Sequence, residues 1–266
     1  MRIAAAQISC TLGDVDANIA KVRDFCSRAK EGGSDLVVFP EMVDTGYAMP
    51  VIKAHASSWN EGAVPALREL ARNLSLAIVC GVSERDDSHI YNAQVFIGAD
   101  GEIAAKYRKT HLFSPAPIEE NKCFTAGCEF TTLGYGGFRM GLSICYDLRF
   151  PEVYRTLAVE EGANVFLISS AWPFPRVEHL RILATARAIE NQSYVILANR
   201  VGKDEGVTSC GSSAIIDPSG AVLAAAPADR EELIYAEVSQ TVLETVRNRM
   251  PVFADRRAEL YSRRPS

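Results

Sequence analysis

The chain has 266 residues, with 28 Lys and Arg against 33 Asp and Glu, a formal net charge of -5 and 48% hydrophobic residues. Folding at this length buries roughly 75% of the surface of the extended chain, so a core forms without metals or disulfides. The acidic balance and the lack of a basic stripe argue against nucleic acid as a partner. No apolar stretch reaches the roughly 20 residues of a membrane span, so we expect no membrane contact.

The first ten residues and the cysteines are used to predict the cellular compartment of the protein. Residues 1–10 hold one basic residue, a short apolar run and no small-residue cleavage site, which predicts a first strand rather than a signal peptide. The seven cysteines are odd in number and scattered along a chain that needs no disulfides. We therefore predict a cytoplasmic protein whose cysteines are mostly buried thiols.

The first half of the chain predicts strands that alternate with helices. The apolar run at residues 36–39 predicts a strand buried on both faces that ends at Pro40 and Glu41. Residues 91–97 and 102–106 flank an Ala-Asp-Gly turn and predict a hairpin, so the sheet is mixed. The other expected elements are strands at 2–9 and 76–81 and helices at 18–30 and 63–73.

The second half repeats this alternation after a loop at residues 106–121 that is rich in proline and charge. We expect strands at 131–133, 138–144, 165–168, 194–198, 214–216, 222–225 and 233–238, and helices at 151–161 and 179–192. No linker, low-complexity stretch or repeat interrupts this order. The sequence therefore predicts a single α/β domain over residues 1–266, with layered sheets inside and helices outside.

Three ionisable residues follow predicted strands or lie in the charged loop: Glu41, Lys109 and Cys145. Ligands of α/β folds bind outside the carboxyl ends of strands, so these positions favour chemistry. Taken alone, each residue is also explained by helix capping, solvation or core packing.

Together the three residue types make a site for acyl transfer. A thiol is a good nucleophile once a base takes its proton, and a carboxylate in a dry pocket is such a base. We assign these roles to Cys145 and Glu41. The oxyanion of the tetrahedral intermediate is then stabilised by Lys109 and by the backbone N–H of Tyr146. Glu41 returns the proton to the leaving amine and activates the water that attacks the thioester.

The segments around these residues resemble the nitrilase superfamily of carbon-nitrogen hydrolases. The resemblance covers essentially the whole chain and rests on AAAQ, FPEM, YRKTHLF, ICYDLRFPE, RAIENQ, ANRVG and the DPSG turn, in that order. It implies an α-β-β-α sandwich of two mixed β-sheets, with Glu41 as general base, Lys109 beside the oxyanion and Cys145 as nucleophile.

The family also carries a second glutamate after the lysine segment. Counting back from Phe124-Thr125-Ala126-Gly127, which resembles the family's F-x-P-G stretch, favours Glu120 over its neighbour Glu119. A carboxylate there would hold the Lys109 ammonium or orient the substrate amide. Ala126 replaces the family's proline, which leaves the path of this loop open.

The residues after Cys145 resemble the amidase branches, including the ω-amidases. True nitrilases tend to carry Trp-Glu at that point, whereas this chain has Tyr146-Asp147. We therefore expect a small amide as substrate, with an N-carbamoyl amine or a nitrile as alternatives.

The resemblance also implies which residues line the pocket. Ala171 and Trp172 follow a buried strand, and Tyr47 begins a loop whose course is not derivable from the sequence. Trp172 is either a pocket wall with a free indole N–H or a core aromatic. Arg149 or Arg176 would pair with a substrate carboxylate, although a structural ion pair is the simpler expectation for each.

Other classes of function fit less well. A Cys-His hydrolase would use His111, which lies two residues after Lys109. A metal site at Cys123 and Cys128 lacks a second ligand pair, and the GYGG stretch at 134–137 lacks the third glycine and the helix of a dinucleotide site. A non-catalytic protein of the same fold is disfavoured because all three reactive residues are present.

The proposed chemistry requires no cofactor and no metal. The resemblance further implies a homodimer or larger homo-oligomer, with the C-terminal segment 241–266 at its interface.

Overall fold

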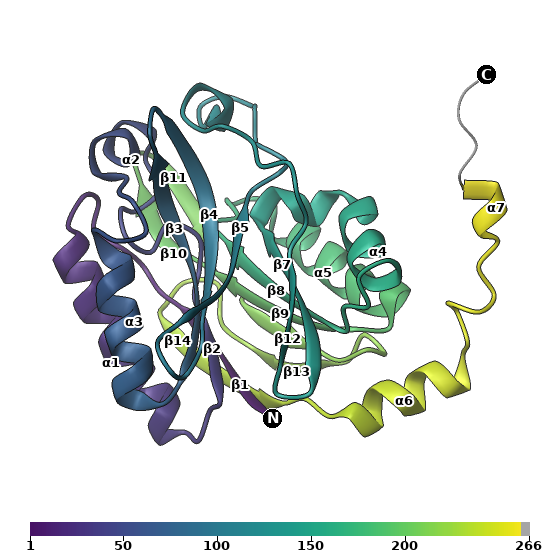
Figure 1. The fold of residues 1–266 in the computed structure, drawn as a ribbon. Coiled ribbons are helices and arrows are strands. Elements are labelled where there is room, and N and C mark those ends of the chain that lie inside the picture. The colour runs from purple at the N-terminus through teal and green to yellow at the C-terminus, as the bar shows by residue number, and fades with distance from the viewer. Residues whose placement is uncertain (262–266) are drawn as a thin grey trace.

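The computed structural model describes residues 1–261 and contains two six-stranded sheets that pack face to face (Figure 1). The first sheet has the strand order β14-β1-β2-β3-β4-β5 and the second has β13-β12-β9-β8-β7-β6. The strands of the first sheet are β1 (Arg2–Gln7), β2 (Leu36–Val38), β3 (Ala77–Asp86), β4 (His89–Ile97), β5 (Ile103–Arg108) and β14 (Glu232–Glu237). The second sheet is formed by β6 (Thr132–Tyr135), β7 (Phe138–Ile144), β8 (Val165–Ser170), β9 (Tyr194–Asn199), β12 (Ala214–Ile216) and β13 (Val222–Ala225).

Helices cover the outer face of each sheet. The first sheet is covered by α1 (Val15–Glu31) and α3 (Ala63–Leu74), and the second by α4 (Pro151–Val159) and α5 (Val177–Asn191). The predicted α-β-β-α sandwich is therefore confirmed. No helix among residues 1–261 has the length and apolar character needed to cross a bilayer.

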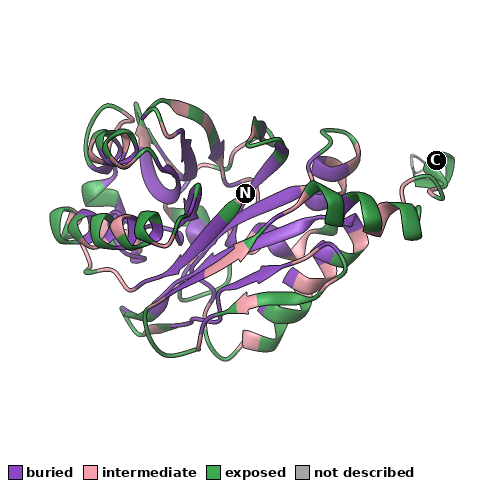
Figure 2. Ribbon diagram, turned by 90° about the horizontal axis from the view of Figure 1, so that it is seen from below, coloured by how far each residue is buried: buried purple, intermediate pink, exposed green. Residues whose placement is uncertain are grey.

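The alternation of side chains along β1 explains the layers. Ile3 and Ala5 belong to the cluster between the sheets, whereas Ala4 and Ala6 belong to the cluster beneath α1 and α3. Successive strand residues point to opposite faces, so a strand covered on both sides is apolar throughout. Figure 2 shows the resulting buried sheets and the exposed outer faces of the helices.

The pairing within each sheet is mixed, as the sequence predicts. Strands β1, β2 and β3 run parallel, and so do β7, β8 and β9, while the outer strands of each sheet are antiparallel. The predicted hairpin of residues 91–97 and 102–106 is β4-β5, and β6-β7 and β12-β13 form two more hairpins. The carboxyl ends of β2, β7 and β8 therefore lie at the same edge of the sandwich.

Several elements differ from the sequence prediction. Strand β3 continues to Asp86, beyond the expected end at Gly81, because it pairs with β4 over its whole length. The sequence did not predict α2 (Met49–His55), the two-stranded sheet of β10 (Val201–Asp204) and β11 (Val207–Cys210), or α6 (Gln240–Arg249). These elements are short or polar and lack a clear apolar period, so tertiary contacts decide them.

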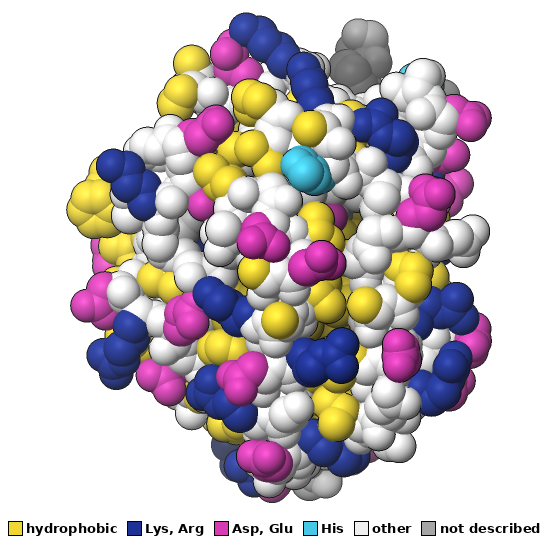
Figure 3. Space-filling model, turned by 90° about the vertical axis from the view of Figure 1, so that its left-hand side faces the viewer, with side chains coloured by type: hydrophobic (Ala, Val, Ile, Leu, Met, Phe, Trp, Pro, Cys, Tyr) yellow, Lys and Arg dark blue, Asp and Glu magenta, His cyan; other side chains and the backbone are white. Residues whose placement is uncertain are grey.

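The C-terminal segment begins against the sandwich and then continues beyond it. Helix α6 buries Leu243 in the core cluster, and the short α7 (Ala258–Tyr261) lies farther from the sheets, as Figure 1 shows. The last part of the predicted interface segment, residues 262–266, lies outside the described residues. On the face that Figure 3 shows, basic and acidic side chains are interspersed, without a continuous basic stripe.

Candidate active site

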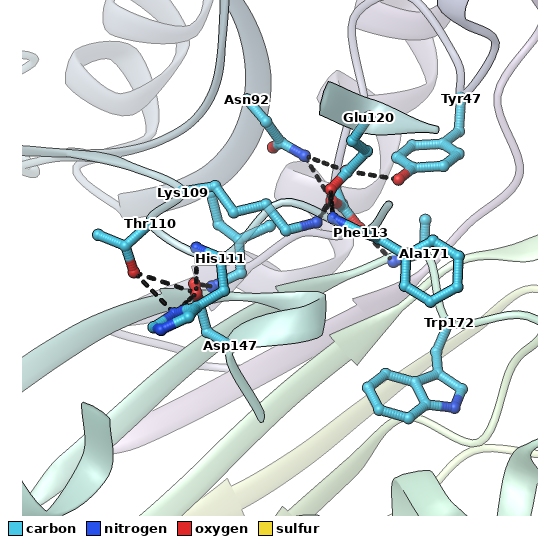
Figure 4. A network of polar contacts seen from close by, with 12 residues as sticks. Tyr47, Asn92, Lys109, Thr110, His111, Phe113, Glu120, Asp147, Ala171 and Trp172 are labelled. Atoms are coloured by element: carbon cyan, nitrogen blue, oxygen red, sulfur yellow. Dashed lines mark hydrogen bonds and ion pairs between the residues drawn. The ribbon is translucent and has the colours of Figure 1, made fainter. Parts of the chain in front are cut away.

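The fold brings Glu41, Lys109 and Glu120 together at the edge where the parallel strands end. Figure 4 shows the side chains of Lys109 and Glu120 pointing toward each other. The ammonium nitrogen of Lys109 lies 2.9 Å from Oε1 of Glu41 and 2.8 Å from Oε1 of Glu120. All three side chains are fully buried. The expected choice of Glu120 over Glu119 matches this geometry, because Glu119 instead pairs with Lys122 at 2.7 Å on the partly exposed side of the loop.

Backbone contacts fix Lys109 directly after β5. Its N–H donates to the Asn92 carbonyl at 2.8 Å, and its own carbonyl accepts from the N–H of Gly127 at 2.9 Å. A Cβ at Gly127 would lie 2.2 Å from the Arg108 carbonyl oxygen, so only glycine allows this approach. The loop with Ala126 in place of proline thus still supports the lysine.

The backbone of Glu41 passes close to Gly81 of the neighbouring strand. It follows β2 by three residues, and its Cα would lie 2.6 Å from a Cβ placed on Gly81 of β3. Glu41 Oε2 accepts from the Ala171 N–H at 2.8 Å, at the end of β8. Two sheets therefore define the position of this carboxylate.

Asn92 and Tyr47 complete the hydrogen bonds of the two carboxylates. The Asn92 side-chain amide donates to Glu41 at 2.6 Å and to Glu120 at 3.0 Å. The Tyr47 hydroxyl donates to Glu120 at 2.5 Å, and the Phe113 N–H donates to the other oxygen of Glu120 at 2.6 Å. Asn92 was not predicted from the sequence, because it lies inside β4 and belongs to none of the motifs around Glu41, Lys109 and Cys145.

Cys145 directly follows β7 and adopts a positive φ of 42°. This left-handed conformation is uncommon outside glycine and is found at sharp turns that present functional side chains. The residue is 8% exposed and lines a pocket with an empty volume of about 300 Å³. The pocket is also lined by Tyr47, Phe113, Ile118, Tyr146, Arg149, Ala171, Trp172, Pro173 and Arg176.

Burial and charge set the protonation of this cluster. Burial, followed by the nearby Glu41 carboxylate, raises the pKa of the Cys145 thiol, so the sulfur keeps its proton at neutral pH. Burial also raises the pKa of Glu41, although Lys109 opposes this. Burial lowers the pKa of Lys109, but the Glu120 and Glu41 carboxylates outweigh it, and the net shift is upward. The lysine therefore stays charged.

Two expectations for the pocket residues are corrected. The indole N–H of Trp172 is not free, because it donates to the Arg176 carbonyl at 2.9 Å; the ring both lines the pocket and is buried. Within residues 1–261, neither Arg149 nor Arg176 forms the ion pair that was the simpler expectation. The Arg149 guanidinium lies over the Trp172 ring, 4.6 Å from its centroid, and Arg176 lies 5.7 Å from the centroid of Phe113.

His111 lies in a separate network and does not line the pocket. Its Nδ1 is 2.9 Å from Oδ1 of Asp147, and its ring stacks on Phe150 with a centroid distance of 3.9 Å. Among the described residues, no three His, Cys, Asp or Glu side chains are grouped to hold a metal ion.

Comparison with known proteins identifies the family. The carbon-nitrogen hydrolase model matches residues 2–248, so the chain belongs to this family and is a carbon-nitrogen hydrolase. It is 36% identical over 261 residues to the 2-oxoglutaramate amidase of Bacillus subtilis, covering 97% of this chain and 98% of that protein.

Two further proteins show the breadth of the family. A nitrilase of Pyrococcus abyssi is 34% identical over 273 residues, covering 99% of this chain and 100% of that protein. The crystal structure of Saccharomyces cerevisiae Nit3, a member of branch 10 of the nitrilase superfamily, superimposes with a TM-score of 0.88 at 30% identity. It covers 97% of this chain and 96% of the yeast chain.

Proposed function

We propose that this protein hydrolyses the terminal amide of a small dicarboxylic half-amide, in the manner of an ω-amidase, through a thioester at Cys145. The observation that carries the proposal is the pocket itself. Cys145 lines it together with two arginines, Arg149 and Arg176, that have no carboxylate partner in the part of the chain that the structure describes. A substrate carboxylate would supply that partner.

Glu41 is proposed as the base that takes the proton of the Cys145 thiol. Its Oε1 accepts from Lys109 and Asn92, whereas Oε2 accepts, among the residues that the structure describes, only the Ala171 N–H. A carboxylate has about four acceptor positions, so Oε2 retains capacity for the thiol proton. The raised pKa of Glu41 makes it a stronger base than an exposed glutamate.

Lys109 and the backbone N–H of Tyr146 are proposed to stabilise the oxyanion. A lysine ammonium carries three protons, and the two carboxylates engage two of them, so one remains for the substrate oxygen. Glu41 then donates its proton to the departing ammonia, and the acyl group stays on sulfur. A water molecule, deprotonated by Glu41, attacks this thioester and releases the carboxylic acid.

The similarity to the 2-oxoglutaramate amidase of Bacillus subtilis supports the proposal that the substrate is an amide with a distal carboxylate. A nitrile or an N-carbamoyl amine remains the alternative, because the same residues serve either reaction and one relative is named a nitrilase.

The test is ammonia release from a panel of 2-oxoglutaramate, succinamate, glutamine, neutral aliphatic amides, an N-carbamoyl amine and a nitrile, with Cys145→Ala as the blank. We expect Cys145-dependent release to be fastest from the half-amides. Arg149→Gln and Arg176→Gln should raise KM for the half-amides at least tenfold while leaving neutral amides within about twofold, since an ionic contact to a carboxylate contributes about 1.5–3 kcal/mol. Activity confined to neutral amides, carbamoyl amines or the nitrile would overturn the substrate class but not the hydrolase.

We also propose that two copies of the chain associate through α5. Ile182 and Ile189 are seven residues apart on this helix, so they lie on one face, and they are 63% and 51% exposed. Light scattering should give the mass of a dimer or a multiple of it. The double variant Ile182→Asp/Ile189→Asp should shift that mass toward 29.0 kDa, and a monomeric wild type would contradict the proposal.

A further inference from the structure

Asp147 is a buried carboxylate that the proposed reaction does not use. It belongs to the short 3₁₀ helix Cys145–Arg149 that follows the nucleophile, and none of its surface is exposed. In the sequence analysis this residue served only to distinguish branches of the family. In the structure it is an acceptor for several donors.

All of these donors come from two short segments. Oδ1 accepts from the His111 N–H at 3.2 Å and from the Thr110 hydroxyl at 3.3 Å, and it lies 2.9 Å from His111 Nδ1. Oδ2 accepts from the Tyr107 hydroxyl at 2.8 Å and from the Ile144 N–H at 2.9 Å. The donors thus lie on both sides of Lys109 and immediately before Cys145.

This arrangement joins two segments from different sheets. Lys109 follows β5 of the first sheet, and Cys145 follows β7 of the second sheet. Figure 4 shows Asp147 and His111 beside the Lys109 segment and apart from the Glu120 carboxylate. The hydrogen bond to Ile144 also closes the turn in which Cys145 adopts its positive φ.

We propose that Asp147 is the positioning residue of this enzyme, which fixes the distance and orientation of the Cys145 thiol relative to the Lys109 ammonium. It touches neither substrate nor reacting atoms and acts through the two residues that do. Its buried carboxylate is suited to this because each oxygen accepts more than one donor, which a neutral side chain of the same size cannot match. The inference rests on the proposed roles of Cys145 and Lys109.

The experiment compares Tyr107→Phe, Asp147→Asn and their double variant by kcat and KM on the best substrate of the panel. Tyr107→Phe removes the hydrogen bond to Asp147, together with the contacts of the hydroxyl to the Thr110 hydroxyl at 3.0 Å and to the Thr110 N–H at 3.2 Å. It should lower kcat about two- to tenfold. Asp147→Asn should lower kcat about a hundredfold, as expected for a misplacement near 1 Å. KM should stay within about twofold in both, and the double variant should be no slower than Asp147→Asn, because the tyrosine acts through the aspartate.

Tyr194→Phe is the matched control, because Tyr194 is equally buried at the start of β9 and its hydroxyl contacts Ser239 rather than this network. We expect it to lower the thermal midpoint without changing kcat. If Asp147→Asn does not fold, Tyr107→Phe and Thr110→Val carry the test.

Equal losses of stability with unchanged kcat in Tyr107→Phe and Tyr194→Phe would overturn the positioning role, and so would strict additivity in the double variant. Iodoacetamide labelling of Cys145 separates this from a failure of the proposed function. If the wild-type protein is labelled at Cys145 but hydrolyses no amide, both the proposed amidase function and the positioning role of Asp147 are overturned. If the wild type is active and kcat is unchanged in both Tyr107→Phe and Asp147→Asn, only the positioning role of Asp147 is overturned.

Discussion

The ammonium nitrogen of Lys109 lies 2.9 Å from Oε1 of Glu41, and neither side chain is exposed to solvent. Removing one member of a buried ion pair leaves an uncompensated charge and typically costs 3–5 kcal/mol. Replacing either Glu41 or Lys109 alone leaves the other charge unpaired in the interior, so such variants are expected to lose stability as well as activity.

Replacing Lys109 tests the oxyanion role. Lys109→Met should lower kcat/KM about a hundredfold or more, as for other deletions of an oxyanion donor. Lys106→Met is the matched control, because Lys106 lies on β5, the strand that Lys109 directly follows, and its ammonium faces the Trp59 ring instead of the site. Steady-state ammonia release at a temperature where both variants are folded provides the measurement. A loss of less than about fivefold would make Lys109 a bystander.

The base is tested against the histidine alternative. Glu41→Gln should reduce turnover by at least a thousandfold, since the thiol keeps its proton without a base. His111→Gln should retain substantial activity, because His111 contacts Asp147 and does not line the pocket. The measurement is kcat of the two variants. A larger loss of kcat in His111→Gln than in Glu41→Gln would identify His111 as the base.

The acid limb of the pH profile reports Glu41. Because burial raises its pKa above the ordinary 4.5, kcat/KM should fall as the pH drops through a midpoint above that value. The Asn92 hydrogen bond at 2.6 Å favours the charged carboxylate. Asn92→Leu should therefore move the midpoint upward by about one pH unit, since a hydrogen bond of about 1.4 kcal/mol equals one unit.

This shift is measured on a neutral amide, so that ionisation of the substrate does not contribute. An unchanged or lower midpoint in Asn92→Leu would show that another group controls the acid limb.

Gly81 is expected to be indispensable for the position of Glu41. A Cβ on Gly81 would lie 2.6 Å from the Glu41 Cα and 2.8 Å from the Pro40 carbonyl oxygen, both backbone atoms. Gly81→Ala should lower the free energy of unfolding by about 1–3 kcal/mol through this overlap and should reduce kcat. Gly134→Ala is the control, because no atom lies within 4 Å of its added Cβ. Urea denaturation gives the free energy of unfolding of both variants, and steady-state rates give their kcat. Equal values for Gly81→Ala and Gly134→Ala would contradict the role of Gly81.

The strands of both six-stranded sheets and the helices α1, α3, α4 and α5 could be predicted from the sequence, and so could the positions of Glu41, Lys109 and Cys145 at or near strand ends. Buried strands such as residues 36–39 are visible as continuous apolar runs, and the residue that follows such a strand lies at its carboxyl end whatever the packing. Glu41 and Cys145 were predicted in this way, and the segment YRKTHLF located Lys109. The resemblance of the FTAG stretch to the family's F-x-P-G favoured Glu120 over Glu119 and left the choice open.

Which side chains meet at the site depends on the packing of the two sheets and cannot be read from the sequence. Asn92 is 51 residues from Glu41 in the chain, and Asp147 is 40 residues from Tyr107, so no local pattern records their contacts. That Arg149 and Arg176 form no ion pair within residues 1–261 likewise depends on which neighbours the loops bring near. The physical reason is that periodicity reports the burial of one element, whereas hydrogen bonds between two sheets depend on how the sheets pack against each other.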